Sequence, residues 1–336
     1  MTSRFSIAVD AMSGDFGPRS TIPATIAFAE SHSDTDISLF LSDGTVVPKE
    51  LPANISIVYS PSVVTMDDSP ANVLRNKQDS TMAQAIEACS QGAADAVISA
   101  GNTGALVALG RHHLGTFDNI RRPAICKAIP TLAGHSYMLD LGANAIADAQ
   151  MLHNFALMGS AMAAELDHNP SPSVAILNIG VEHSKGNRVI HEVDALLKQD
   201  GRLNYVGYIE GDAIYSGSVD VIVADGFVGN VALKVSEGVA RLALGQLKSS
   251  FRQNLYGRLL GRFAQPLLRK WHKQFDPARY NGACLLGLNR PLIKSHGSTD
   301  ERGFLSALVM AKELAGTGLT QRLQAQAIAR KLGEGQ

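Results

Sequence analysis

Polar, glycine-rich loops that follow short apolar runs are where this 336-residue chain could carry out chemistry. The most compact is SAGNTGA, in which Gly101 and Gly104 permit close backbone approach and Ser99, Asn102 and Thr103 add side-chain donors. A strand that turns into a helix here leaves backbone N–H groups unpaired, which suits phosphate oxygens. The pattern is typical of an anion cradle and equally of an ordinary strand-to-helix connection.

Four further loops combine glycine with acidic residues or asparagine: AVDAMSGDFGP (8–18), LDLGANA (139–145), LNIGVEHSKGN (177–187) and ADGFVGN (224–230). Their candidate binding or catalytic groups belong to Asp10, Asn144, Lys185, Asp225, Gly226 and Asn230. Glycine beside asparagine or aspartate is also common in turns. Because all five loops follow apolar runs, we predict that they share one polar cleft at the carboxyl ends of strands.

Cations in polar loops are the second set of candidates. Arg75 lies in LRNKQD, Lys185 in EHSKGN, and Lys294 and His296 in IKSHGSTD. Most loop cations are simply solvated, and the end of IKSHGSTD also suits the cap of a helix predicted to begin near Phe304. Helix capping does not explain Lys294 and His296, so we treat this segment as the loop richest in candidate functional groups.

Several common enzyme classes are disfavoured. The sequence contains no G-x-G-x-x-G, G-x-x-x-x-G-K-[ST], G-x-S-x-G or H-E-x-x-H motif, which argues against nicotinamide, ATP, hydrolase and zinc enzymes. Cys89, Cys126 and Cys284 are far apart and odd in number, so we expect no disulfide framework, no metal site and a reducing cytosol. A net charge of -1 argues against nucleic acid as the main partner.

The elements that must position these loops alternate along the chain. Apolar, β-branched runs predict strands at 5–9, 37–41, 55–59, 96–99, 174–178 and 219–223. Helical spacing predicts helices at 21–29, 83–91, 147–166 and 190–199. This alternation predicts an α/β fold with a mostly parallel central sheet and helices on both faces. No linker divides the chain, so we expect a single domain over 1–336, and its uncharged spans are too short to cross a membrane.

Seven segments closely resemble, in the same order, the PlsX phosphate acyltransferases: AVDAMSGDFGP, ISAGNTGALVA, RRPA, LDLGAN, HSKGN, VDVIVADGFVGNVALK and LLGLNRPLIKSHGSTD. The family usually has glycine at Ser13, and the run ANAIAD also differs. The resemblance implies a dimer with a three-layer α/β/α sandwich, similar to isocitrate and isopropylmalate dehydrogenases and to phosphotransacetylase. It also implies transfer of a fatty acyl group from acyl carrier protein to inorganic phosphate, for phospholipid synthesis, with no metal or organic cofactor.

For such a reaction the loops suggest roles. We hypothesise that SAGNTGA holds the attacking phosphate through Asn102 and the helix N-terminus, and that Lys185 or Lys294 supplies positive charge. Asn230, His296 or the backbone of residues 225–226 could stabilise the oxyanion, and His296 could protonate the leaving thiolate. The catalytic candidates are therefore Lys185, Asn230, Lys294 and His296. The phosphate- and substrate-binding candidates are Asp10, Arg75, Ser99, Gly101, Asn102, Thr103, Gly104, Asn144, Asp225 and Gly226.

A basic amphipathic segment at about 248–275 has aromatic and leucine residues at every fourth position. It suits peripheral contact with an anionic membrane at the inner face of the cell, a partner subunit, or the acidic carrier protein. Three other functions stay open: a phosphotransacetylase-like enzyme using acyl-coenzyme A, a non-catalytic scaffold of lipid synthesis, and a dehydrogenase of the same fold.

Overall fold

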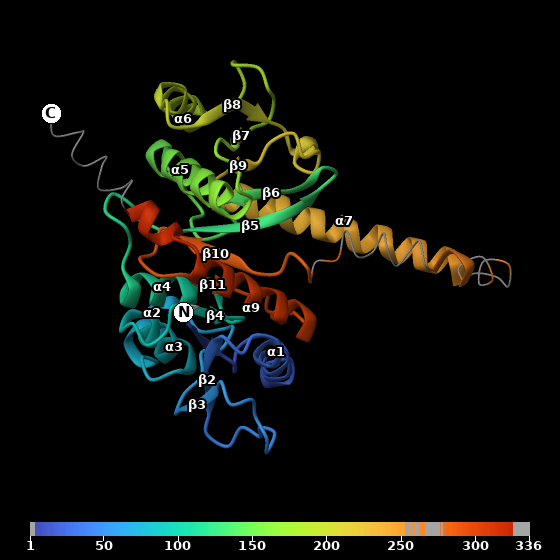
Figure 1. Cartoon of the computed structure of the whole chain (residues 1–336). Helices are drawn as coiled ribbons and strands as arrows, with labels where there is room; N and C mark the ends of the chain where they lie inside the picture. Colours follow the sequence, from blue (N-terminus) through green and yellow to red (C-terminus); the bar gives the residue numbers. More distant parts are fainter. Residues whose placement is uncertain are drawn as a thin grey trace.

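The computed structural model describes residues 4–252, 256, 259, 262–265, 276 and 278–324. Eleven strands in these residues form one sheet in the order β3-β2-β1-β4-β11-β10-β5-β6-β9-β7-β8 (Figure 1). The strands are β1 (Phe5–Asp10), β2 (Thr35–Ser42), β3 (Ile55–Ser60), β4 (Ala96–Ser99), β5 (Ala124–Thr131), β6 (Gly134–Leu139), β7 (Ser173–Leu177), β8 (Asn204–Ile209), β9 (Val221–Val223), β10 (Ala283–Leu286) and β11 (Leu292–Lys294).

Two parallel blocks make up this sheet. The block β3-β2-β1-β4-β11 and the block β6-β9-β7-β8 are each parallel, as predicted. Between them, β10 pairs antiparallel with both β11 and β5, and β5 pairs antiparallel with β6. The short connections within β5–β6 and β10–β11 allow only hairpins, because a parallel pair needs a long crossover. The two parallel blocks therefore run in opposite directions.

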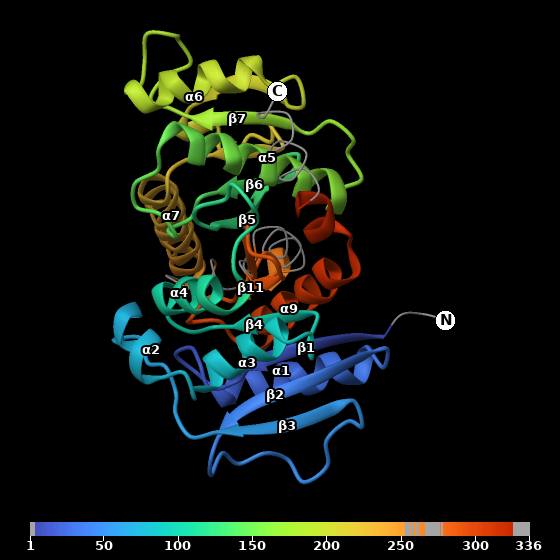
Figure 2. The ribbon, with the colours of Figure 1, turned by 90° about the vertical axis from the view of Figure 1, so that its left-hand side faces the viewer.

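Helices cover both faces of the sheet (Figure 2). One face is covered by α1 (Pro18–Ser31), α5 (Ala149–Leu166), α6 (Arg188–Gln199) and α9 (Glu301–Gly316). The other face is covered by α3 (Thr81–Ser90), α4 (Thr103–Leu114) and the start of α7 (Gly226–Arg252), with α2 (Pro70–Asn76) packed on α4. A 3-10 turn, η1, spans Gly211–Ala213. The predicted three-layer α/β/α sandwich is confirmed.

Every predicted strand and helix is present to within a few residues, but β5, β6, β8, β10 and β11 were not predicted. The single domain over 1–336 stays a prediction. Beyond the body of the molecule, α7 extends as a long arm (Figure 1). Most of the predicted amphipathic segment at 248–275 lies outside the described residues; within it, Tyr256, Leu259 and Phe263 are exposed. No helix in the described part of the chain combines the length and hydropathy needed to span a bilayer.

Candidate active site

Three predicted residues lie in one row across three neighbouring parallel strands. Asp10 at the end of β1 pairs with Ser99 of β4, which pairs on its other side with Lys294 of β11. Residues directly opposite each other on neighbouring strands face the same side of the sheet. The Ser99 hydroxyl donates to the Asp10 carboxylate at 2.7 Å, so this row is already connected by hydrogen bonding.

The Asp10 carboxylate is fully buried and holds its own loop together. It accepts hydrogen bonds from the hydroxyls of Ser13, Thr81 and Ser99. Burial raises the pKa of Asp10, and these hydrogen bonds oppose that rise. Ser13, where the resemblance led us to expect glycine, thus supplies an extra donor to this carboxylate, while Gly14 beside it has a φ of 92°. Asp10 positions the loop and presents no surface to a ligand.

The SAGNTGA turn leads into α4 as predicted, but the side-chain amide of its asparagine already has hydrogen-bond partners within the protein. Asn102 caps α4, accepting from the Ala105 N–H at 3.1 Å and donating to the carbonyl oxygens of Met66 and Asp68. In the described residues, the backbone N–H groups of positions 102–104 have no protein acceptor. The helix N-terminus can therefore bind an anion through its backbone, and the Asn102 side chain orients it.

Lys294 lies directly against this turn. Its ammonium donates to the carbonyl oxygens of Ala100, at 3.2 Å, and Ser295. Burial lowers the pKa of Lys294 to about 8, and the charge of Lys234 lowers it as well. The ion pairs formed within the described residues do not include Lys294, although the charges of Asp15 and Asp10 act on it. A half-buried ammonium without a carboxylate partner is suited to a bound anion.

His296 connects this loop to α7. Its Nε2 lies 3.1 Å from the ammonium of Lys234, and its Nδ1 lies 2.9 Å from the hydroxyl of Ser298. Burial lowers the pKa of His296, and the neighbouring Lys234 charge lowers it further. The imidazole is therefore neutral at pH 7. A charged Lys234 can only donate, so Nε2 accepts a hydrogen bond from its ammonium. Nδ1 accepts from the backbone N–H of Ser298 at 3.2 Å and lies beside the hydroxyl of the same residue.

Sequence reasoning missed Lys127, Lys234 and Glu237. Lys234 forms an ion pair with Glu237 at 3.0 Å, and both act through their charges on Lys127 of β5. Asn230, Lys234 and Glu237 follow at helical i, i+4 and i+7 spacing, so the predicted Asn230 could have pointed to the other two. Nothing local to β5 could have identified Lys127, because only the sheet order brings it near.

A second group of loops surrounds the start of α7. Asp140 accepts hydrogen bonds from the backbone N–H groups of Ile125, Ala143 and Asn144 and from the Asn144 side chain. The Gly226 N–H donates to the Asn144 carbonyl oxygen at 2.8 Å. Asn144 is buried, so it builds the loop and does not face a ligand.

The other predicted groups on α7 are divided between structure and surface. Asp225 caps α7 by accepting from the Val228 N–H at 2.8 Å. Asn230 is exposed and lies against Gly142. Because Gly226 N–H is already bonded within the loops, the backbone at 225–226 is a poor oxyanion donor, and Asn230 is the better candidate.

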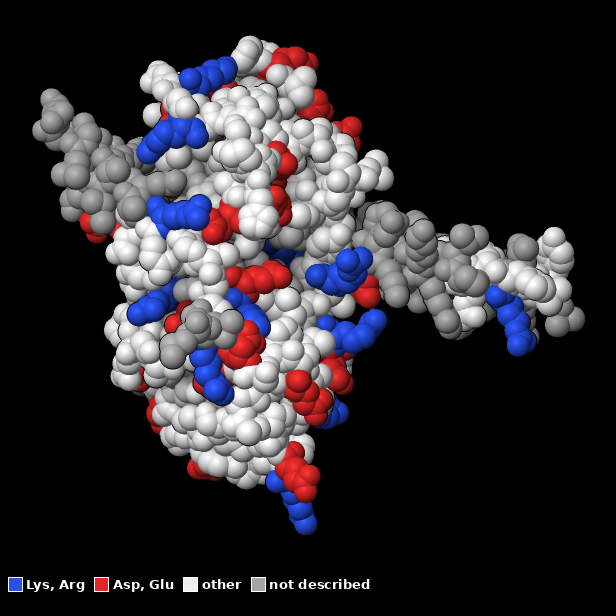
Figure 3. Space-filling model, viewed as in Figure 1, with Lys and Arg blue, Asp and Glu red and all other residues white. Residues whose placement is uncertain are grey.

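The five loops predicted to share one cleft lie at the ends of strands that run in opposite directions, because the two parallel blocks are antiparallel to each other. The loops after β1 and β4 form one group with the loop after β11, and those after β6 and β9 form another. The first turns of α7 connect the two, from Gly226 to Lys234. The shared cleft stays a prediction. Figure 3 shows a hollow near the point where α7 leaves the body, with basic side chains in and beside it.

Two predicted cations are not brought into this cluster. Lys185 is exposed in the loop after β7, packed on Gly180, and its ammonium has no hydrogen-bond or ion-pair partner in the described chain. Arg75 is exposed on α2. Its neighbour Lys77 has a structural role, since it pairs with Asp68 at 2.6 Å.

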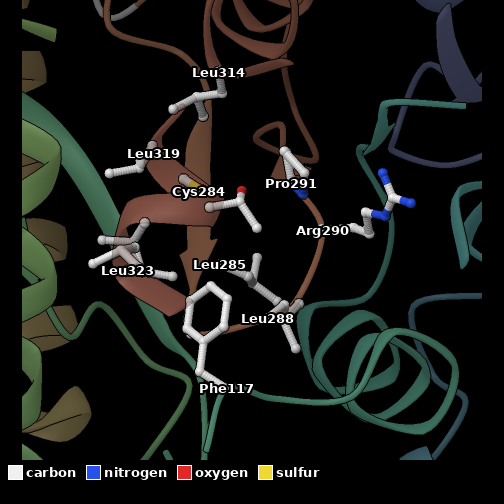
Figure 4. A pocket seen from close by; sticks show the side chains of 12 residues that line it. Phe117, Cys284, Leu285, Leu288, Arg290, Pro291, Leu314, Leu319 and Leu323 are labelled. Atoms are coloured by element: carbon white, nitrogen blue, oxygen red, sulfur yellow. The ribbon is translucent and has the colours of Figure 1, made fainter. Parts of the chain in front are cut away.

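An apolar pocket lies at the other end of the β10–β11 hairpin (Figure 4). Its lining includes Phe117, Leu285, Leu314, Leu319 and Leu323, and the side chain of Arg290 points away from it. The pocket offers almost no polar group to a phosphate. We therefore place the candidate active site at the basic cluster and not at this pocket.

The chain is similar to known acyltransferases over nearly its whole length. A family described as "Fatty acid synthesis protein" matches residues 5–322. A phosphate acyltransferase from Nitrosococcus oceani is 47% identical over 95% of this chain and 96% of that protein. Another from Saccharophagus degradans is 44% identical over 100% of this chain and 99% of that protein.

The chain belongs to the PlsX family of phosphate acyltransferases. It is thus an acyltransferase of fatty acid and phospholipid synthesis. Solved structures agree on the fold of this acyltransferase: a phosphotransacetylase from Streptococcus pyogenes covers 94% of this chain and 95% of its own, with a TM-score of 0.60. A branched-chain phosphotransacylase from Enterococcus faecalis covers 93% and 99%, with a TM-score of 0.59. Both are 14% identical to this chain, so they bear on the fold alone.

Proposed function

We propose that this phosphate acyltransferase takes a fatty acyl group from the thioester of acyl carrier protein and joins it to inorganic phosphate. The observation that carries the proposal is the Lys294 ammonium, half-buried against Ala100 beside the free N–H groups at the start of α4. A backbone cradle with one adjacent lysine holds a phosphate dianion without removing its nucleophilicity. Family membership supports the acyl transfer.

In the reaction, a phosphate oxygen forms a bond to the thioester carbon, and the carbon–sulfur bond breaks. No serine or cysteine nucleophile is needed, because phosphate is itself the nucleophile. The oxyanion that forms on the thioester oxygen is stabilised by a donor such as Asn230, and one such donor typically lowers the barrier by about 3 to 4 kcal/mol. The products are acyl phosphate and the free carrier thiol.

The leaving thiolate needs a proton. The hypothesis that His296 supplies this proton is disfavoured, because the lowered pKa of His296 leaves its ring neutral at pH 7. Lys294 is the better source, because its pKa of about 8 is close to that of a thiol. His296 then acts as a hydrogen-bonding partner of Lys234. Lys185 stays a catalytic candidate, although no contact joins its ammonium to this cluster in the described residues.

We propose that the protein is a cytoplasmic homodimer. We also propose that residues 248–275 contact the inner face of the cell membrane. Exposed Tyr256, Leu259 and Phe263 support an apolar contact in that segment. We also propose that the acidic carrier protein docks on basic side chains near the hollow in Figure 3.

The test is to supply a long-chain acyl carrier protein with and without inorganic phosphate, and to measure free carrier thiol and hydroxylamine-trapped acyl phosphate. We expect both products, in equal amounts, only with phosphate. Long-chain acyl-coenzyme A at the same concentration is the comparison donor. Preference for the coenzyme donor would favour the phosphotransacetylase-like alternative, and carrier binding without turnover would favour the scaffold.

A further inference from the structure

Two lysines flank a small residue in one row of the central sheet. Ala283 of β10 pairs with Lys294 of β11, and the next residue of β10, Cys284, pairs with Cys126 of β5. Because β10 and β5 are antiparallel, Ala283 is opposite Lys127. Lys294, Ala283 and Lys127 therefore face the same side of the sheet, with the two lysine Cα atoms about 10 Å apart. Within this row of the sheet, the residue between the two lysines is Ala283, whose side chain is a methyl group.

A third lysine reaches this row from above. The first turns of α7 pack on the same face of the sheet through Ala232 and Leu233, and Lys234 follows directly. Its charge lowers the pKa of both Lys294 and Lys127, although burial is the larger cause for each. Three ammonium groups from three elements thus meet at one place.

Few carboxylates balance these charges. Glu237 pairs with Lys234 and acts on Lys127 through its charge, while Asp15 and Asp10 act on Lys294 without forming an ion pair in the described chain. His296, also within this cluster, is neutral at pH 7 and adds no anion. Lys127 and Lys294 are half-buried and Lys234 is exposed. Repulsion among the three ammonium groups is unfavourable until an anion neutralises them.

We propose that Lys127 and Lys234, together with Lys294 and the free N–H groups at the start of α4, complete the site that binds inorganic phosphate, and that the small side chain of Ala283 leaves room for the anion between the lysines. Lysine ammonium groups bind phosphate as point charges, and a methyl group leaves room for it where a larger side chain would not. Glu237 and His296 position Lys234 by holding its ammonium at 3.0 Å and 3.1 Å. This inference rests on the proposed function, since it assigns the binding site of the phosphate that acts as the nucleophile.

The first test measures the binding of inorganic phosphate to the full chain by phosphorus NMR, with no thioester donor present. The donor's absence ensures that any bound phosphate is inorganic phosphate and not a phosphate group of the carrier. We expect Lys127→Met and Lys234→Met to weaken phosphate binding by about 10- to 100-fold each. Lys127→Arg and Lys234→Arg restore the charge and should recover most of the affinity. Binding of both methionine variants within twofold of the unmodified chain would overturn the proposal.

A further variant tests the space above Ala283. Ala283→Val adds bulk without changing any charge, and we expect it to raise the KM for phosphate at least tenfold with the KM for acyl carrier protein unchanged. The matched control is Lys312→Met, which removes a lysine of α9 that pairs with Asp34 at 2.7 Å, away from the row. Loss of phosphate-dependent turnover in the unmodified chain would refute the proposed function. Normal turnover with an unchanged phosphate KM in all site variants would refute only this inference.

Discussion

Replacing Lys294 by methionine should abolish activity and yet stabilise the fold at neutral pH. The pKa of Lys294 falls from 10.5 to about 8 on folding, chiefly because the side chain is buried. Keeping this group charged in the folded state at pH 7 therefore costs roughly 3 kcal/mol. Methionine has nearly the same length and no charge, so it removes that cost.

A smaller loss opposes this gain. Methionine cannot donate to the carbonyl oxygens of Ala100 and Ser295, and each lost hydrogen bond costs about 1 kcal/mol. The variant should therefore be about 1 kcal/mol more stable than the unmodified chain at pH 7. Its turnover should fall at least about 100-fold, as expected for removing a charged group from the transition state.

The pH dependence separates the charge from the packing. Between pH 8 and pH 10.5 the unfolded chain holds a proton on Lys294 that the folded chain does not, so the stability of the unmodified protein rises with pH. Lys294→Met lacks this contribution. As the pH rises, the difference in unfolding free energy between the variant and the unmodified chain should therefore change by roughly 3 kcal/mol in total, so that the variant becomes the less stable of the two. Urea unfolding of both proteins, followed by circular dichroism at several pH values, measures the difference. A difference that stays constant within about 0.5 kcal/mol would refute the reasoning.

Three further results are expected from the loops and the core. Asp140→Ala should cost about 3 to 5 kcal/mol of unfolding free energy, because four N–H donors lose their acceptor, whereas Asp148→Ala removes one helix cap and should cost about 1 kcal/mol. Gly229→Ala places a methyl group on the carbonyl oxygen of Asp140 and should destabilise α7, while Gly238→Ala on the same helix meets open space and should stabilise by up to about 1 kcal/mol; thermal unfolding of both compares them. The three cysteines are buried with raised pKa values, so a thiol reagent should react with them only after unfolding; fast reaction of the native chain would contradict their burial.

The sequence predicted six strands of the parallel blocks and missed five strands, of which β11, β10, β5 and β6 lie side by side at the centre of the sheet. Strands such as β1 and β4 are buried on both faces, and their continuous apolar runs are visible locally. In β5 the apolar run is interrupted by Lys127, and β10 and β11 have only four and three residues. The interruption occurs because Lys127 faces the basic cluster, so the poorest prediction falls at the candidate site.

The candidate site shows the same division. Asp10, Ser99, Lys294 and His296 were predicted because each stands in a conspicuous loop, and the structure brings them together. Lys127 could not be predicted, since only the order of strands places it near Lys294. Buried residues such as Asp10 were predicted as ligand contacts because sequence shows a polar group but not the hydroxyls that enclose it.

In the proposed reaction, a phosphate oxygen attacks the thioester at the Lys294 cluster. The most direct measurement is a single turnover with phosphate labelled by ¹⁸O at all four oxygens, with the product analysed by mass spectrometry. We expect the unmodified chain to form acyl phosphate that retains all four labelled oxygens, and Lys294→Met to lose this product. Unlabelled free fatty acid as the main product, or thiol release that does not depend on phosphate, would contradict it.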